Sequence, residues 1–189
     1  IIPARGGSRR LPRKNIVDIQ GKPAIAYPVR AADESGLFDQ IVVSTDDREI
    51  KEIALEWGAD VFDRPEELAG DTAGVADVCL DVVQKLSDQG NKPHWFCCIY
   101  ATAIFLRPED LTGSFNIFKD YPDVRVVMGV SEYNLQPAQA MMESDGFLKP
   151  RWPDLVTLQS QQTGRMVASN GTLYWADTRT FLTQKTFYV

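Results

Sequence analysis

The sequence is poor in the residues that build metal centres, disulfide frameworks and membrane spans. Its 189 residues include one histidine, His94, and three cysteines. A histidine-based metal cluster is therefore excluded, and we expect no catalytic role for His94. Cys97 and Cys98 are adjacent and Cys79 is distant, so neither a disulfide framework nor a C-x-x-C metal pair is present. No apolar run reaches the roughly eighteen residues of a membrane span, and this composition suits a reducing cytoplasm.

Two familiar phosphate-binding signatures are also missing. The sequence has neither the G-x-x-x-x-G-K-[ST] of a P-loop nor the G-x-G-x-x-G of a dinucleotide fold, which makes an NAD-dependent enzyme unlikely as a class. Acidic residues outnumber basic ones by 26 to 20, a formal net charge of −6 that argues against a general nucleic-acid binder. With 44% hydrophobic residues, the length suits one well-buried α/β domain, with no internal repeat.

Positive charge is concentrated at the start of the chain. Residues 1–15 read Ile-Ile-Pro-Ala-Arg-Gly-Gly-Ser-Arg-Arg-Leu-Pro-Arg-Lys-Asn, an apolar strand end followed by glycines and a run of cations without a carboxylate. Gly6 and Gly7 lack a Cβ, so their N–H groups and that of Ser8 can approach a ligand closely. The pattern favours binding of a polyphosphate. The alternative is a solvated basic loop without a ligand.

Strand and helix patterns alternate from Ile1 to Tyr121, which predicts a mostly parallel sheet with helices on both faces and a site along the carboxyl ends of the strands. The chain turns helical at 23–35, where Pro28 should kink or shift the helix. Short strands are expected at 41–43, 60–62, 95–100 and 125–130, with further helices after Asp47, Gly74 and Pro108 and a last one from Asp177. Cys97 and Cys98 should point to opposite faces of a central strand as core residues.

Three polar segments after these strands have two readings each. Asp46 or Asp47 can cap a helix or form a polar rim beside a ligand. Arg64 can face an anionic ligand or form a surface salt bridge. The turn Thr72-Ala73-Gly74 can cap the following helix or receive a polar group of a ligand at the helix N-terminus.

The opening segment resembles the acylneuraminate cytidylyltransferases, whose members begin approximately I-I-P-A-R-G-G-S-K and continue to K-N and G-K-P. Here the segment runs to Gly21-Lys22-Pro23, with Arg9 for the usual lysine. The resemblance implies a Rossmann-like nucleotidyltransferase fold that binds CTP, with Arg5 and Lys14 on its phosphates as the catalytic cations. The implied nucleotide-binding residues are Arg5, Gly6, Gly7, Ser8, Lys14, Asn15, Arg64, Thr72, Ala73, Gly74, Tyr100 and Thr102.

A second segment narrows the resemblance. Cys97 to Leu106 reads C-C-I-Y-A-T-A-I-F-L, similar to the pseudaminic acid branch of the family, with Ile104 in place of a proline. The sugar side departs more from the family pattern. Gln159-Ser160-Gln161 resembles an R-S-Q motif with Gln159 replacing the arginine, and Asn170-Gly171 opens an N-G-x-x-Y motif. The resemblance implies that Gln159, Ser160, Gln161, Asn170 and Gly171 border the sugar.

The resemblance further implies an enzyme that joins a nonulosonic acid, with pseudaminic acid favoured, to CMP and releases pyrophosphate. Legionaminate, sialate or KDO as the sugar, or a nucleotide-binding homologue without activity, are the alternatives. Residues 131–170 lack regular periodicity, and by resemblance they form an arm of a single domain that contributes to a homodimer and to the sugar pocket. Mg²⁺ is the expected cofactor. The sequence begins inside an expected strand and stops abruptly, so we expect residues to be missing at both ends, and we expect the metal-binding acids to lie beyond Val189.

Overall fold

The computed structural model describes residues 1–8 and 11–189, with Ser160 described for its main chain only. The chain forms two compact units, one of residues 1–128 with 171–189 and a smaller one of residues 129–170. Strands β7 (Val126–Glu132) and β10 (Val167–Asp177) run from one unit into the other. Arg9 and Arg10, two cations of the opening run, lie outside the described residues.

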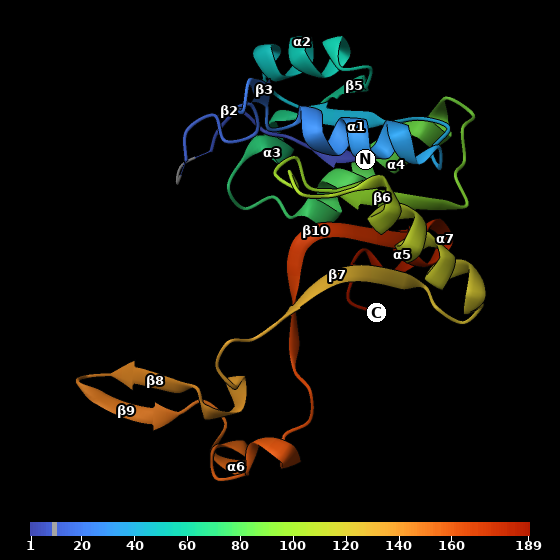
Figure 1. Cartoon of the computed structure of the whole chain (residues 1–189). Helices are drawn as coiled ribbons and strands as arrows, with labels where there is room; N and C mark the ends of the chain where they lie inside the picture. The colour runs from blue at the N-terminus through green and yellow to red at the C-terminus, as the bar shows by residue number, and fades with distance from the viewer. Residues whose placement is uncertain (9–10) are drawn as a thin grey trace. The chain divides into compact units, whose positions relative to one another are not determined.

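The larger unit is built on strands that form two three-stranded sheets, shown in Figure 1. In the first sheet, β4 lies between β1 and β5 and is parallel to both. In the second, β10 lies between β6 and β7 and is antiparallel to β6. Ile1 connects the sheets, because its amino group donates to the Cys97 carbonyl at 2.8 Å and its own carbonyl accepts from the Ile99 N–H at 2.9 Å. The remaining strands of this unit are β1 (Ile2–Pro3), β2 (Asp18–Ile19), β3 (Lys22–Pro23), β4 (Val42–Thr45), β5 (Asp60–Asp63) and β6 (Trp95–Ile99).

Helices cover both faces of these strands. The helices of the larger unit are α1 (Ala26–Ser35), α2 (Arg48–Glu56), α3 (Glu66–Ala69), α4 (Val75–Asp88), α5 (Pro108–Asp120) and α7 (Thr178–Gln184). One core cluster joins α1, α2 and α5 to the strands, and Figure 1 draws α1 in front of the sheet. Separate clusters join α4 and α7 to the opposite face. The prediction of a parallel-stranded α/β sheet flanked by helices is confirmed.

The two adjacent cysteines of β6 point to opposite faces of the strand, as predicted. Cys97 packs in the cluster with α1 and α5, whereas Cys98 packs with Cys79 in the cluster with α4 and α7. All three cysteines are buried and free. Burial raises the pKa of the Cys97 thiol, so it stays protonated.

The first helix differs from the prediction at its start. Pro23 belongs to the two-residue strand β3, and α1 begins at Ala26 rather than at Pro23. Pro28 therefore lies in the first helical turn, where a missing N–H breaks no intrahelical hydrogen bond. Of the two expected effects of Pro28, a kink or a shifted start, the structure shows the shifted start.

The smaller unit contains more regular structure than the sequence indicated. Strands β8 (Met141–Ser144) and β9 (Phe147–Pro150) form an antiparallel hairpin around Asp145-Gly146, both with positive φ. Asp-Gly is a typical hairpin turn, so this dipeptide was a sequence signal for the hairpin within a segment that lacks regular periodicity. The other elements are η1 (Pro137–Gln139), α6 (Pro153–Val156) and η2 (Ser160–Gln162). Within residues 1–8 and 11–189, no helix combines the length and the apolar character needed to cross a membrane.

Candidate functional site

The predicted phosphate loop lines a cavity of about 480 Å³ after the carboxyl end of β1. Arg5, Gly6, Gly7 and Ser8 contribute one side of it, as predicted from the opening segment. The opposite side comes from the turn after α3. The lining residues are Arg5, Gly6, Gly7, Ser8, Pro12, Arg13, Ala69, Gly70 and Asp71.

Arg5 spans this cavity from the loop to the turn after α3. Its guanidinium donates to the Gly70 carbonyl at 2.9 Å and forms an ion pair with Asp71, Nη2 to Oδ1, at 2.9 Å. The two side chains remain 30% and 38% exposed. The guanidinium is thus oriented and accessible, and an incoming anion would compete with the Asp71 carboxylate for it.

The glycine of the loop is required by a close approach to α2. A Cβ placed on Gly6 would lie 2.5 Å from Oδ2 and 2.9 Å from Cβ of Asp47, which is too close for any side chain. The Gly6 N–H donates to Oδ1 of Asp46 at 2.9 Å, and the Ser8 N–H donates to the Gly6 carbonyl at 2.9 Å. These two N–H groups therefore hold the loop in shape, which differs from the expectation that both approach a ligand.

Asp46 and Asp47 divide the two roles that the sequence left open. The Asp47 side chain accepts the Ile50 N–H and caps α2, while Asp46 holds the loop through Gly6. Asp47 also pairs with Arg13, which in addition contacts Glu49. The hydrogen bond from Arg13 is the main cause that lowers the pKa of Asp47 below its usual value, with the Ile50 and Glu49 N–H groups acting in the same direction and burial acting against it.

Arg13 is a lining residue that sequence reasoning did not single out. It adopts φ 56°, a conformation that is unfavourable for a residue with a side chain. Its contacts with Asp47 and Glu49 hold it there. The run of cations pointed to this segment, but only the folded loop shows which of them faces the cavity. Lys14 is half-buried and is not among the lining residues.

Arg64 lies in a neighbouring cavity of about 550 Å³ that shares Ala69 with the first. Its side chain is buried, with Nη2 donating to the Ser44 carbonyl at 2.7 Å and Nε to the Ser44 hydroxyl at 3.3 Å. Burial lowers the pKa of Arg64, and the nearby charge of Asp46 opposes this shift. The same Ser44 carbonyl accepts the Ala4 N–H at 2.9 Å, so one residue fixes both Arg64 and the start of the loop.

The remaining residues predicted to bind the nucleotide follow other strands and turns. Asn15 lies beneath the loop and binds the Arg5 carbonyl. Thr72 and Gly74 are exposed and Ala73 is half-buried, directly after Asp71 and before α4, whose first N–H groups begin at this turn. Tyr100 and Thr102 follow the carboxyl end of β6. Burial is the main cause that raises the pKa of the Tyr100 phenol, and the neighbouring Tyr174 raises it further.

The residues predicted to border the sugar are divided between the two units. Gly171 belongs to the larger unit, with φ 64°, and a Cβ placed there would lie 3.9 Å from Cε1 of Tyr100. The structure thus brings one predicted sugar residue beside one predicted nucleotide residue. In the smaller unit, Gln159 precedes η2, which begins at Ser160, and the Gln159 N–H donates to Oε1 of Gln162 at 3.0 Å. Gln161 and Asn170 are exposed there.

The acidic residues of the described chain do not supply a metal cage. No group of three or more His, Cys, Asp or Glu side chains among residues 1–8 and 11–189 could hold a metal ion. Asp47 and Asp71 are each paired with an arginine. The residues present therefore do not form a magnesium site on their own, and the expectation of Mg²⁺ stays a prediction.

A family model described as "Cytidylyltransferase" matches residues 1–166. The chain belongs to the cytidylyltransferase family. The segment that carries the match includes the loop, the turn after α3 and the whole of the smaller unit except its last residues.

Individual members of the cytidylyltransferase family agree with this placement. The chain is 44% identical over 119 residues to a pseudaminic acid cytidylyltransferase of Campylobacter jejuni subsp. jejuni serotype O:2, which covers 62% of this chain and 51% of the relative. It is 33% identical over 192 residues to the CMP-N,N'-diacetyllegionaminic acid synthase of Legionella pneumophila subsp. pneumophila, which covers 100% of this chain and 81% of that relative. The chain thus spans about half the length of the Campylobacter relative.

A solved structure supports the same fold. The CMP:2-keto-3-deoxy-manno-octonic acid synthetase complexed with CTP superposes with a TM-score of 0.70 at 21% identity, covering 97% of this chain and 74% of that one. At this identity the likeness establishes the fold, which is that of the family predicted from the opening segment.

Proposed function

We propose that this chain is a cytidylyltransferase that activates a nonulosonic acid with CTP, giving a CMP-sugar and pyrophosphate. The observation that carries the proposal is the oriented, accessible guanidinium of Arg5 in a glycine-bounded cavity. The proposal is supported by membership of the cytidylyltransferase family. It is also supported by the two relatives described above, a cytidylyltransferase and a CMP-sugar synthase.

The residues of the loop suit the charge that such a reaction develops. Attack of a sugar hydroxyl on the α-phosphorus of CTP displaces pyrophosphate, and the negative charge on the leaving phosphates must be stabilised. Arg5 would take this role after exchanging Asp71 for a phosphate oxygen, with Arg13 at the same cavity. Lys14 remains a proposed second cation from the resemblance. Asn15 and Ser44 would keep the loop in position while Arg5 exchanges the Asp71 carboxylate for a phosphate oxygen.

Mg²⁺ forms part of this proposal as an ion that arrives with the nucleotide. In many phosphate-transfer sites magnesium is held by one or two carboxylates together with substrate phosphates, and it neutralises their charge. We assign it no ligand in this chain. A homodimer and a cytoplasmic location are likewise proposed. The three free, buried cysteines suit the second. Exposed apolar side chains in the β8–β9 hairpin and the segment after it suit the first: Met141, Met142, Phe147, Leu148 and Trp152.

Pseudaminic acid is the proposed sugar because of the 44% identity to a pseudaminic acid cytidylyltransferase. Legionaminic acid is the second candidate, since the match to the legionaminic acid synthase extends over the whole chain. A competition assay with CTP, Mg²⁺ and equal amounts of pseudaminic, legionaminic and sialic acid would separate them by the CMP-sugar formed. We expect CMP-pseudaminate to dominate. CTP binding without pyrophosphate release would instead identify a binding protein without activity.

A further inference from the structure

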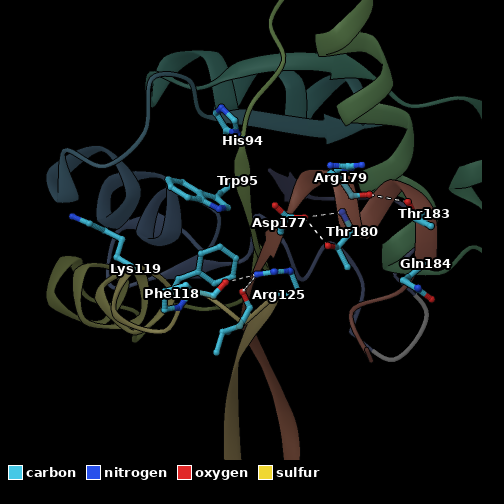
Figure 2. Close-up of a pocket in the computed structure, with 12 residues that line it drawn as sticks. His94, Trp95, Phe118, Lys119, Arg125, Asp177, Arg179, Thr180, Thr183 and Gln184 are labelled. Carbon is cyan, nitrogen blue, oxygen red and sulfur yellow. Dashed lines mark hydrogen bonds between the residues drawn. The ribbon is translucent and has the colours of Figure 1, made fainter.

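A further cavity of about 810 Å³ lies at the amino end of β6, whereas Tyr100 of the candidate site follows the carboxyl end of that strand. Trp95 begins the strand and His94 precedes it, and both line the cavity together with residues from the end of α5, the segment before β7, the end of β10 and α7. Figure 2 shows these side chains around a common opening. Its volume falls within the roughly 300–1,000 Å³ typical of small-molecule pockets.

Positive charge exceeds negative charge in this cavity. Lys119, Arg125 and Arg179 line it, against one carboxylate, Asp177. That carboxylate already accepts the N–H of Thr180 at 2.8 Å and its hydroxyl at 2.6 Å. Within the described part of the chain, none of these three cations forms a salt bridge with a carboxylate.

Asp177 remains ionised and is influenced by both arginines. Burial would raise its pKa, but the hydrogen bonds from Thr180 and the charges of Arg125 and Arg179 hold the pKa below its usual value. Figure 2 shows the guanidinium groups of Arg125 and Arg179 on two sides of Asp177, while the amine of Lys119 extends away. Nη1 of Arg125 already donates to the carbonyls of Pro122 and Val124, so the donors left for a further anion are its other N–H groups and those of Arg179.

The walls of the cavity are held in place before any ligand binds. The Asp177 N–H donates to the Arg125 carbonyl at 2.9 Å, and the Thr178 N–H donates to the His94 carbonyl at 3.0 Å. Trp95 is 43% exposed, although its indole packs edge-on against Phe118 with ring centroids 5.9 Å apart. Phe115 contacts the same indole in a T-shaped arrangement, with ring centroids 5.6 Å apart, so the indole is held in place while part of it offers apolar surface to a flat ring.

We propose that this cavity is a second binding site, for a nucleotide whose phosphate binds the guanidinium groups of Arg125 and Arg179 from the open side of the cavity and whose base packs on Trp95. The two arginines supply planar donors suited to a phosphate, and the indole supplies the apolar surface that a free phosphate would not need. The site is separate from the cavity of Arg5 and does not depend on the function proposed for it.

The test is a titration of the protein, in its full-length form, with adenosine monophosphate, inorganic phosphate and adenosine. The probe is the indole N–H signal of Trp95 in a ¹⁵N-labelled sample, identified among the 4 tryptophans by its loss in Trp95→Phe. We expect a saturable shift with adenosine monophosphate at lower concentration than with phosphate or adenosine alone. No shift of this signal, or equal affinity for phosphate and for the nucleotide, would overturn the proposal.

Matched variants locate the binding. The double variant Arg125→Ala/Arg179→Ala should weaken the nucleotide by about tenfold or more, because two charge-assisted contacts are lost. Arg107→Ala removes a similarly exposed arginine from an ion pair at the other end of α5 and should leave the titration unchanged. Arg5→Ala should also leave the Trp95 titration unchanged. If the double variant binds as the unaltered protein does, or if Arg5→Ala abolishes the shift, the second site does not exist.

Discussion

The side-chain amide of Asn15 donates a hydrogen bond from Nδ2 to the main-chain carbonyl of Arg5, with a distance of 2.9 Å. Asn15 is only 4% exposed. Its main-chain carbonyl accepts the Ile25 N–H at 2.8 Å, just before α1 begins. The segment that carries Arg5 is therefore tied to the entry of the first helix. This contact places the guanidinium through the main chain, before a ligand arrives.

Replacing Asn15 with alanine should destabilise the protein. The change leaves the carbonyl of Arg5 without its buried donor, a loss of about 1–3 kcal/mol in the free energy of unfolding. Thermal unfolding should shift downward by roughly 2–4 °C for each kcal/mol in a chain of this size. Asn116→Ala, on the exposed face of α5, is the control. Equal melting temperatures for the two variants would show that the Asn15 contact does not hold the loop.

The two glycines of the loop should respond differently to an added methyl group. In Gly6→Ala the new Cβ meets Asp47 at 2.5 Å, whereas at Gly7 no atom of the described residues lies within 4 Å. Overpacking of this kind costs about 1–3 kcal/mol. We expect Gly6→Ala to lower the melting temperature and Gly7→Ala to change it little. A stable Gly6→Ala variant would mean that the loop does not pack on Asp47 as described.

Asp71 should act as a competitor of the nucleotide phosphates. Asp71→Asn removes the charge that pairs with Arg5. Exposed ion pairs are worth about 0.2–1 kcal/mol, so the KM for CTP should fall by a few-fold. Asp63→Asn, which removes an exposed partner of Lys51 instead, is the control for the loss of one negative charge. A raised KM in Asp71→Asn would indicate that this carboxylate assists the nucleotide rather than competing with it.

The pairing of Asp47 with Arg13 should make stability depend on pH at the acidic end. The pKa of Asp47 is lowered in the folded protein, so its contribution is complete above the unfolded pKa of about 3.9 and is lost as the pH falls through the lower folded value. Asp47→Asn keeps a good helix cap and removes the charge. In urea unfolding, the stability difference between the two proteins should be largest near about pH 7 and shrink below about pH 4. A difference independent of pH would contradict the ion pair.

The sequence was most informative where local chemistry decides the outcome. The opening segment, the apolar run of β6 and the spacing of α4 and α5 each specify their structure within a few residues. The roles of Asp46 and Asp47 could not be separated by sequence, because both follow β4 and only the path of the loop decides which one meets Gly6. Arg13 and Asp71 were missed as lining residues for the same reason. Their positions depend on contacts between segments more than thirty residues apart.

The most direct test of the account is the affinity for CTP of Arg5→Ala, measured by isothermal titration calorimetry beside Arg107→Ala. Both variants lose an arginine from an ion pair, but of the two only Arg5 lines the cavity of the loop. We expect Arg5→Ala to bind CTP about tenfold or more weakly, as for the loss of a charge-assisted phosphate contact, and Arg107→Ala to bind it normally. Unchanged affinity in a folded Arg5→Ala protein would show that this loop does not hold the triphosphate.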